Sequence, residues 1–307
     1  MSLFITGGTG SLGSAICGLP ATQNLSRVVV YSRSESRQAD MKSRIPEGGA
    51  GGMRYILGDI RDQYKMSKAM TNCEYVIHAA AMKRIDTCEY DPMEAVSVNI
   101  DGTMNVIKSC LENNVASAIF VSTDKACEPV SLYGATKMAA ERAWIAANNL
   151  GKTRFNVCRY GNVLSSTGSL LKIWEQQLKA EKPVSITAKG MRRYFWSLAE
   201  ASEFVMLRMF NNDSQKDRGV IYVPQMRSFD IEEMSTPYAK FGTDYTGARC
   251  PEKLNEDLVS VYEGEHCYKR EGYYAIYPSY HDWSGKQEII GEAVPEGFKM
   301  STEVAEL

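Results

Sequence analysis

The first residues hold the pattern that most restricts the fold of this chain, a short apolar run that leads directly into a glycine-rich turn. Leu3 to Thr6 predicts a buried strand, and a helix is expected after the turn. Spaced glycines allow a tight turn, the close approach of backbone to a pyrophosphate, and close packing of helix on strand. The N–H groups and positive dipole end of that helix would bind the phosphates. The order strand, glycine turn, helix therefore predicts a dinucleotide site at Gly7, Thr9, Gly10, Ser11, Leu12 and Gly13.

Apolar runs and helical stretches alternate through the first half of the chain. Further strands are predicted at 27–31, 53–57, 75–81, 118–121 and 155–163, and helices at 92–114 and from about residue 132. Strands that alternate with helices indicate a parallel sheet covered on both faces. We therefore expect an α/β fold with a Rossmann-type, doubly wound parallel sheet and a smaller C-terminal substrate-binding lobe.

The regular alternation stops after residue 163, which sets the predicted domain boundaries. Residues 1–163 should form the dinucleotide-binding domain, and 164–193 together with 225–272 the substrate-binding lobe. The lobe begins with a predicted helix at 170–179, a strand at 184–187 and a basic and aromatic stretch at 192–195. An apolar helix at 198–210 and a strand at 220–223 should return residues 194–224 to the main sheet. Residues 273–307 show no clear periodicity and receive no predicted role.

Composition argues against several classes of protein. The net charge of −2 and the lack of a long basic run argue against a nucleic-acid partner. No apolar stretch reaches the ~18–20 residues that span a bilayer, and the first apolar run meets the glycine turn too soon for a secretory leader. The eight cysteines show no Cys-x-x-Cys spacing, and the three histidines show no metal-ligand spacing. We therefore expect a cytoplasmic protein of a reducing compartment, without a membrane segment or metal site.

The end of the second strand bears on which dinucleotide binds. NAD-binding folds place an acid near this point to accept a bond from the ribose 2′-OH, whereas this chain has Ser32 and Arg33, with Arg37 downstream. A cation beside the ribose favours a 2′-phosphate, so we expect NADP. The alternative is a solvated basic loop.

Further residues of the same half are candidates for cofactor contacts. Asp59, with Ile60 beside it, follows the third strand and would contact the adenine or else cap the next helix. Small residues end the fourth strand and would let the nicotinamide half lie close: Ala79, Ala80 and Ala81. Lys83 lies near the same opening. Asn99, on an apolar helix face, is either a hydrogen-bonded interior group or part of a proton relay.

The fifth strand and the helix after it carry the catalytic candidates. The strand ends in Thr123, Asp124 and Lys125, three groups that can move protons, at the edge where open α/β sheets bind ligands. Tyr133 and Lys137 are four residues apart on the next helix, so their side chains share a face. An ammonium group there would lower the tyrosine pKa from ~10 and provide a phenolate base for an alcohol proton. The alternative is a surface Tyr-x-x-x-Lys on an ordinary helix.

Together these motifs resemble the extended short-chain dehydrogenase/reductases, and among them the inverting UDP-N-acetylglucosamine 4,6-dehydratases. The resemblance covers nearly the whole chain, and these segments carry it: Thr6 to Gly13, His78 to Lys83, Ser122 to Ala126, Tyr133 to Lys137, Arg159 to Val163 and Arg249 to Glu256. The Asp-Lys pair is its most specific signal, because retaining dehydratases carry Asp-Glu there and 4-epimerases carry neither. The departures fall in the second lobe, at Ser165, Thr167, Cys250 and Asn255.

The resemblance implies an NADP-dependent enzyme that converts UDP-GlcNAc to UDP-2-acetamido-2,6-dideoxy-hexos-4-ulose with inversion at C5. Tyr133, aided by Lys137, would take the proton of the sugar 4-OH while the C4 hydride passes to NADP+. Lys125, its pKa depressed from ~10.4, would remove the C5 proton, and a protonated Asp124 would protonate the leaving 6-OH. Hydride would then return to C6. Thr123 would polarise the 4-oxygen.

The same resemblance assigns the UDP-sugar to a further set of side chains. The expected substrate-binding residues are Lys83, Asn162, Arg192, Arg193, Arg249 and Glu252. Taken alone, the basic members of this set would be ordinary solvated surface charges. Relatives pair through the helices that match 92–114 and 133–149, so a homo-oligomer is expected.

Three other functions fit part of the pattern. A sugar-nucleotide 4-epimerase or a 4-ketoreductase would share Tyr133, Lys137 and the glycine turn, but the Asp124-Lys125 pair argues against the epimerase. A non-catalytic NADP-sensing regulator is the third, although such proteins often lack the tyrosine and lysine. Release of a 4-keto product would separate the dehydratase from the epimerase. Net consumption of NADPH would instead indicate the ketoreductase.

Overall fold

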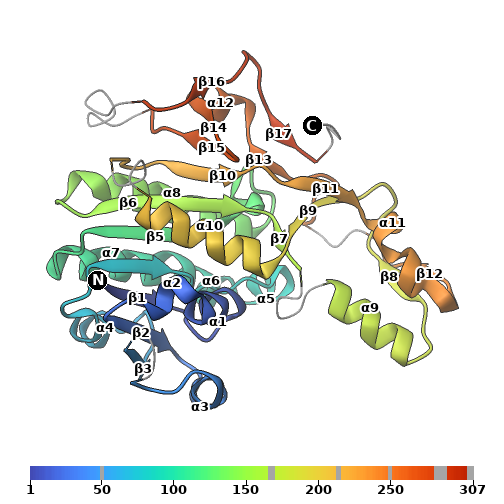
Figure 1. Ribbon diagram of the computed structural model, residues 1–307. Coiled ribbons are helices and arrows are strands. Elements are labelled where there is room, and N and C mark those ends of the chain that lie inside the picture. Colours follow the sequence, from blue (N-terminus) through green and yellow to red (C-terminus); the bar gives the residue numbers. More distant parts are fainter. Residues whose placement is uncertain (49–51, 165–169, 212–215, 248–250, 280–288, 303–307) are drawn as a thin grey trace.

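A ten-stranded sheet forms the centre of the protein, with the strand order β16, β14, β15, β10, β6, β5, β4, β1, β2, β3 (Figure 1). The computed structural model describes residues 1–307 except 49–51, 165–169, 212–215, 248–250, 280–288 and 303–307. The strand bounds, in the order given, are Glu292–Ala293, Cys267–Arg270, Tyr273–Ile276, Ile221–Pro224, Arg154–Tyr160, Ser117–Thr123, Tyr75–His78, Ser2–Thr6, Arg27–Ser32 and Met53–Leu57. From β10 to β3 all neighbours are parallel. The order β3-β2-β1-β4-β5-β6 is that of dinucleotide-binding folds, which confirms the predicted Rossmann-type sheet.

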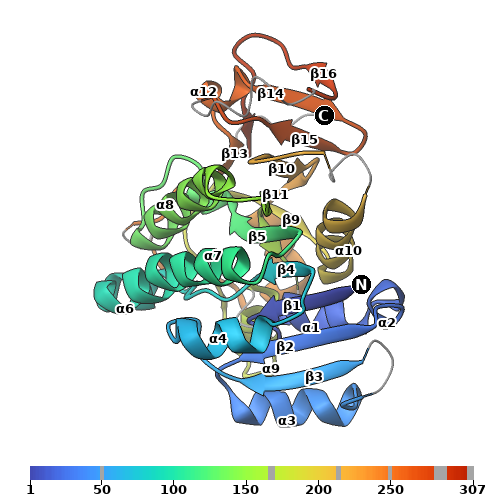
Figure 2. The ribbon, with the colours of Figure 1, turned by 90° about the vertical axis from the view of Figure 1, so that its left-hand side faces the viewer.

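Helices cover both faces of this sheet (Figure 2). One face carries α4 (Gln63–Met70), α7 (Gly102–Glu112) and α8 (Leu132–Ala146), and the other α1 (Ser11–Gly18), α3 (Glu35–Arg44) and α10 (Leu198–Phe210). Successive strand residues point to opposite faces, so Phe4 packs in the layer of Trp144 from α8 while Ile5 packs in the layer of Val205 from α10. Because both faces are buried, the central strands contain continuous apolar runs, such as Leu3–Ile5 in β1, Val28–Val30 in β2 and Ala118–Val121 in β5, and these runs made the strands predictable.

The helix predicted at 92–114 is one continuous stretch that contains a wider turn. It consists of α6 (Pro92–Val96), a π-helical turn at Ser97–Asp101, and α7. The turn directs Asn99 inward, where its amide donates to the carbonyl oxygen of Met82 (2.9 Å) and to the Thr136 hydroxyl (3.0 Å). The Asn99 Oδ1 accepts from the Met82 N–H (2.8 Å). Of the two alternatives for Asn99, the structure therefore supports the hydrogen-bonded interior group, which joins the segment after β4 to α8.

A smaller lobe contains two short sheets and a core of its own around Trp174. Its elements are β7 (Asn162–Val163), α9 (Leu170–Lys179), β8 (Val184–Ile186), β9 (Arg192–Trp196), β11 (Arg227–Asp230), α11 (Ile231–Ser235) and β12 (Thr243–Tyr245). Two expectations differ from what is observed. The strand predicted at 155–163 divides at Gly161, where a Cβ would lie 2.5 Å from that of Tyr194, and its end pairs with β9 in the small sheet. The basic and aromatic stretch 192–195 is itself a strand.

The C-terminal part of the chain returns to the large sheet. β14 lies within residues 225–272, which we expected in the substrate-binding lobe, and β15 lies within 273–307, for which no role was predicted. The two strands form an antiparallel hairpin on β10. Arg270 of this hairpin makes a buried bidentate contact with Asp217 (2.8 and 3.1 Å). Further on, β13 (Asp257–Val259) pairs with β17 (Met300–Ser301), and α12 (Val261–Gly264) follows β13.

Candidate active site

The glycine turn after β1 has a geometry that suits a dinucleotide. Gly7 has φ +64°, in the left-handed region that favours glycine, and a Cβ there would lie 2.8 Å from the Ala80 Cα. The turn therefore packs directly against the alanines that follow β4, which ends at His78 rather than at residue 81. The N-cap of α1 is Gly10, which has no side chain to occupy the helix N-terminus. Backbone N–H groups and the positive end of the helix dipole can then serve a pyrophosphate, so these residues fit the cofactor.

The ends of β2 and β3 bring Arg33 and Asp59 together. The Arg33 guanidinium lies 3.6 Å from the Asp59 carboxylate, which also accepts a 2.7 Å bond from Arg61. Burial raises the pKa of Asp59, but the bonds and charge of Arg61 outweigh it and hold that pKa below its usual value. The N-cap of α4 is Asp62, whose carboxylate accepts from the Lys65 N–H (3.0 Å). The helix-capping alternative for Asp59 is therefore wrong.

Other residues predicted for the cofactor differ in exposure. Ser32 is buried, and its hydroxyl accepts a bond from Gln38 (3.1 Å). Ile60 is buried as well. Arg37 and Lys83 have exposed side chains.

The turn after β5 and the start of α8 bring four predicted catalytic residues together. The Thr123 hydroxyl donates to Asp124 Oδ1 (2.8 Å), and Lys125 Nζ donates to the same oxygen (3.1 Å). Tyr133, in the first turn of α8, lies close enough to Thr123 and Lys125 for both to lower its pKa. Gly134 permits this approach, because a Cβ there would lie 2.2 Å from the Lys125 carbonyl oxygen. The acid, the amine and the phenol thus converge at the carboxyl end of β5.

The expected effect of Lys137 on Tyr133 is not what the structure contains. Burial raises the pKa of Tyr133 to about 12, although the Lys125 charge and the Thr123 hydroxyl lower it in part. Lys137 instead donates to the Val121 carbonyl oxygen (2.7 Å) and lies 3.7 Å from the centre of the Phe120 ring. Its burial lowers the pKa of Lys137 to about 7. The cation that favours a Tyr133 phenolate is therefore Lys125.

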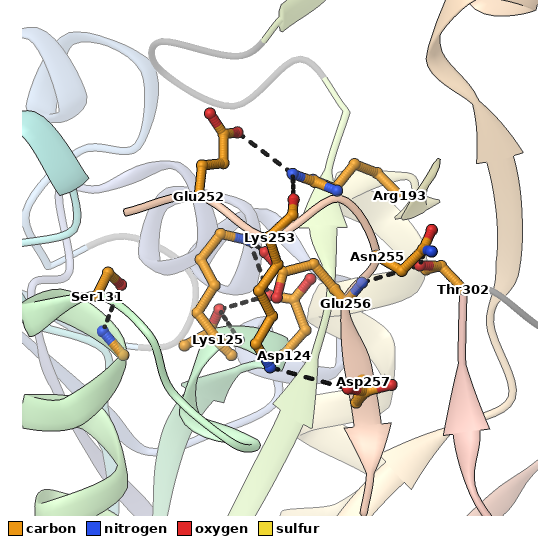
Figure 3. Close-up of polar contacts among 12 residues, drawn as sticks. Asp124, Lys125, Ser131, Arg193, Glu252, Lys253, Asn255, Glu256, Asp257 and Thr302 are labelled. Carbon is orange, nitrogen blue, oxygen red and sulfur yellow. Dashed lines mark hydrogen bonds and ion pairs between the residues drawn. The ribbon is translucent and has the colours of Figure 1, made fainter. Parts of the chain in front are cut away.

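Lys125 also has a second partner, which the sequence analysis did not single out. Its Nζ lies 3.3 Å from Oε1 of Glu256, a residue just before β13 (Figure 3). Burial lowers the pKa of Lys125, but the negative charges of Asp124 and Glu256 outweigh it and raise that pKa above its usual value. The pKa of Lys125 is therefore raised by its neighbours in the protein, whereas the sequence analysis expected it to be lowered. Glu256 is the last residue of the Arg249 to Glu256 motif. The motif includes this residue but gives no indication that it contacts Lys125.

The predicted substrate-binding residues have different surroundings in the structure. Arg193 is buried and donates to the carbonyl oxygens of Lys253 (2.7 Å) and Leu254 (2.7 Å), while it pairs with Glu252 (3.3 Å) (Figure 3). These contacts hold the segment that leads to Glu256. Arg192 donates to the Ser228 hydroxyl (3.1 Å), Asn162 is half-buried in β7, and Arg249 lies outside the described residues.

A small recess opens beside the Lys125 amine. It is lined by Ile85, Lys125, Val130, Ser131, Pro251, Glu252, Lys253 and Glu256. The amine and the Glu256 carboxylate therefore face one space, which lies between the turn after β5 and the segment that Arg193 holds.

Three other observations concern the described part of the chain. It contains no group of three or more His, Cys, Asp or Glu side chains arranged to hold a metal ion. None of its helices is both long and apolar enough to cross a membrane. The seven cysteines it includes are free and buried.

Comparison with known proteins agrees with this geometry. A family described as polysaccharide biosynthesis proteins matches residues 3–278. An inverting UDP-N-acetylglucosamine 4,6-dehydratase of Campylobacter jejuni is 37% identical over an alignment of 315 positions, which covers 98% of this chain and 92% of that protein. A UDP-glucose 4-epimerase of Rickettsia felis is 34% identical over 90% of this chain and 82% of its own length.

Solved structures show the same architecture. Pen from Bacillus thuringiensis superposes with a TM-score of 0.88 at 28% identity, covering 99% of this chain and 94% of its own. DesIV, a dTDP-glucose 4,6-dehydratase from Streptomyces venezuelae solved with NAD bound, has a TM-score of 0.73 at 18% identity, over 83% of this chain and 87% of its own. The second likeness concerns the fold alone. The chain therefore belongs to the polysaccharide biosynthesis protein family and is a relative of the inverting UDP-N-acetylglucosamine 4,6-dehydratases, as its motifs predicted.

Proposed function

We propose that this protein is an NADP-dependent UDP-N-acetylglucosamine 4,6-dehydratase that inverts C5. The observation that carries the proposal is the Lys125 amine, held beside the Asp124 carboxyl group and close to the Tyr133 phenol. Oxidation at C4 needs a group that takes an alcohol proton, and elimination of water needs a base at C5 and an acid at the leaving oxygen. These three groups come from one turn and one helix start. The names of the relatives supply the substrate class, a UDP-sugar.

The chain's own residues divide the proton transfers among them. Tyr133 takes the proton of the sugar 4-OH, and the Thr123 hydroxyl lies close to that phenol. A dinucleotide held at the glycine turn, Gly7 to Gly13, would supply the hydride acceptor for C4 and the hydride donor for C6. The new 4-ketone acidifies the C5 hydrogen, which Lys125 removes. Asp124 gives its proton to the 6-oxygen, which leaves as water.

Two electrostatic conditions must be met in the working enzyme. Tyr133 has its pKa raised to about 12 by burial, so an additional positive charge near its oxygen is required to make the phenolate accessible. The oxidised nicotinamide carries such a charge. Lys125 must lose its proton before it can act on C5, although Asp124 and Glu256 favour its charged form.

Product analysis tests the reaction. Incubation with UDP-GlcNAc and catalytic NADP+ in heavy water should give a 4-keto, 6-deoxy sugar nucleotide, with deuterium at C5 in the NMR spectrum and no net change in NADPH. Stoichiometric consumption of NADPH would replace this function by a ketoreductase. Lys125→Ala should abolish deuterium exchange at C5, and exchange that survives would remove Lys125 from the role of base.

The second candidate is a 4-epimerase, which the Rickettsia felis relative favours by its name. Epimerisation needs proton removal at the 4-OH but neither an acid at C6 nor a base at C5. The Asp124 and Lys125 side chains, both directed to one contact, would then have no chemical task. An epimerase would return a UDP-hexose of unchanged mass, whereas the dehydratase product is lighter by one water.

The preference for NADP rests on Arg33. It is half-exposed at the end of β2, within 3.6 Å of Asp59, where this fold places the adenosine ribose. A 2′-phosphate would gain a charge-assisted bond from it. Arg33→Ala should weaken NADP+ binding by about tenfold, which corresponds to one such bond, and leave NAD+ binding nearly unchanged. Equal losses for both dinucleotides, measured by calorimetry, would contradict the assignment.

We also propose a homo-oligomer in the cytoplasm. Large apolar side chains are exposed on one of the two helices by which relatives pair, with Met93 at 76% and Met104 at 37% of their full exposure, and Tyr90 just before that helix is at 91%. Such side chains are typical of surfaces covered by a partner. The free thiols of the described cysteines suit a reducing compartment. Light scattering on the purified protein measures the assembly, and a monomeric mass would contradict it.

A further inference from the structure

The cluster around Lys125 contains more carboxylate than the proposed reaction has used. Lys125 Nζ lies between two carboxyl groups, with Asp124 Oδ1 at 3.1 Å and Glu256 Oε1 at 3.3 Å. Each acid uses one oxygen for this contact. The second oxygens, Asp124 Oδ2 and Glu256 Oε2, are buried and have no hydrogen-bond partner within the described residues. Buried acceptors of this kind are costly as anions, and a proton on one of them removes part of that cost.

Glu256 is held in this position by a dedicated set of contacts. Its backbone N–H donates to the Thr302 hydroxyl (2.9 Å), and its carbonyl oxygen accepts from the Thr302 N–H (2.9 Å). The preceding residues are fixed by Arg193 of β9, through the carbonyl oxygens of Lys253 and Leu254 (both 2.7 Å). A side chain supported from two strands and directed at the catalytic amine is not an incidental surface acid (Figure 3).

We propose that Glu256 is a positioning residue that acts through Lys125, by accepting the Lys125 proton so that a neutral amine and a protonated Asp124 exist together. The inference rests on the proposed dehydratase function. With Asp124 and Lys125 alone, a single shared proton favours the Lys125 ammonium and the Asp124 carboxylate, an ion pair that offers neither acid nor base. Two protons on the same pair give the acid but leave the amine charged. A second carboxylate resolves this, since two protons can then reside on Asp124 and Glu256.

The proton balance of the elimination step closes within this cluster; C5 afterwards takes a proton from solvent, and Tyr133 returns the 4-OH proton to solvent. Before elimination, Lys125 passes a proton to Glu256, which becomes a carboxylic acid. Lys125 then takes the C5 proton, and Asp124 gives its proton to the departing 6-oxygen. The proton on Lys125 next passes to Asp124 Oδ1, 3.1 Å away, so Asp124 is an acid again. Lys125 is then neutral and Glu256 still protonated, as they were before the C5 proton was taken.

The electrostatic surroundings of Glu256 agree with a proton-accepting role. Burial and the charge of Asp124 raise the pKa of Glu256, and they outweigh the charges of Lys125 and Arg193, which lower it. The charged and titratable groups that face this cluster come from several elements: Asp124 and Lys125 after β5, Tyr133 of α8, and Arg193 and Tyr194 of β9. Glu256 is thus a better acceptor than an exposed glutamate would be.

Glu256→Gln tests the inference, because glutamine keeps the size and the contact to Lys125 but cannot take its proton. We expect kcat with UDP-GlcNAc to fall by about a hundredfold or more, with KM changed less than about threefold. C4 oxidation should persist, so reduced nicotinamide should accumulate on addition of substrate while C5 exchange is lost. The pH dependence of kcat should change shape, and Glu256→Asp should restore part of the rate. Glu265→Gln, at an exposed acid beyond α12, is the matched control.

A double-mutant cycle separates action through Lys125 from an independent effect of the Glu256→Gln change, and Glu256→Asp is the variant to use where Glu256→Gln folds poorly. If Glu256 acts through Lys125, the Glu256→Gln change should cost nothing further in a Lys125→Met background. The inference is overturned if Glu256→Gln keeps the wild-type kcat, C5 exchange and pH profile, or if the two losses multiply. Failure of the wild-type protein to release a 4-keto product would overturn the dehydratase function itself, and is measured first.

Discussion

Two buried clusters of charge lie in this protein, and they differ in how completely their polar atoms are paired. In the first, the Arg159 guanidinium makes five hydrogen bonds, four to the carboxylates of Glu141 and Glu263 and one to the Leu258 carbonyl oxygen. Arg159 and Glu141 are almost fully shielded from solvent, at 1% and 0% exposed. This cluster joins β6, α8 and α12 in one fixed geometry.

In the second cluster, one amine faces two carboxyl groups, and each of these keeps a buried oxygen with no partner among the described residues. The positive charge is outnumbered there, and the number of protons is not fixed by the contacts. A cluster whose polar atoms are all paired holds structural elements together. A cluster whose carboxyl groups keep unpaired oxygens can exchange protons with a substrate. The Arg159 cluster and the Lys125 cluster therefore differ in how completely their polar atoms are hydrogen-bonded, rather than in burial or charge.

Asp124→Asn should have the largest effect on the second cluster and almost none on stability. Asparagine Oδ1 can accept the bonds that Thr123 and Lys125 now donate, but the side chain carries no acidic proton. Loss of a general acid lowers kcat by about 10²–10⁴-fold. Product formation by NMR and urea unfolding are the measurements. A variant within tenfold of the wild-type kcat would show that Asp124 is scaffold like Glu141.

Arg159→Met should have the opposite effects, a large loss of stability and little loss of activity. It leaves the Glu141 and Glu263 carboxylates buried without a cation, which costs about 3–5 kcal/mol of unfolding free energy. The variant that remains folded should keep its activity, since no reacting group is touched. Arg142→Met is the control: Arg142 is 57% exposed and lies 3.8 Å from Glu263, so it should cost less than about 1 kcal/mol. Urea midpoints that move equally for both variants would break the comparison.

The paired cluster also predicts an acid transition. Burial raises the pKa of Glu263, but the charge and hydrogen bonds of Arg159 outweigh this and lower it to about 2. A carboxyl group with a depressed pKa in the folded state stabilises the protein above its unfolded pKa, and this is lost as the pH falls toward 2. Between pH ~4.5 and ~2 the wild type should lose roughly 3 kcal/mol more than Glu263→Gln. Equal acid sensitivity of the two proteins, by thermal unfolding, would contradict this.

The smallest expected effect concerns stability at Glu256, where the sign reverses. Because the pKa of Glu256 is raised in the folded state, its contribution is most favourable below its unfolded pKa and is lost as the pH rises. Glutamine mimics the protonated form, so Glu256→Gln should gain Tm relative to the wild type between pH 5 and pH 8. A relative loss of Tm over that range would mean that the two clusters respond alike to protons.

The parts of the fold and site that depend on residues close together in the sequence were predictable from the sequence. β1 to β6 contain apolar runs because both sheet faces are covered, and Asp124, Lys125 and Tyr133 follow from a strand end and a helix start. β9 and the β14–β15 hairpin were not assigned as strands, because their short segments pair only with distant ones. The same limit applies to side chains. Lys137 bonds to Val121 rather than acting on Tyr133, and nothing local to residue 125 indicates Glu256.

The pairing of Thr302 with Glu256 has a consequence for biosynthesis. The strands that carry the glycine turn and the Tyr133 helix start are complete within the first half of the chain, whereas Glu256 is braced by residues near its end. A polypeptide still emerging from the ribosome would fold its N-terminal half first and the segment that contains Glu256 last. Premature termination before Thr302 would then yield a protein that binds cofactor but stalls after the first hydride transfer.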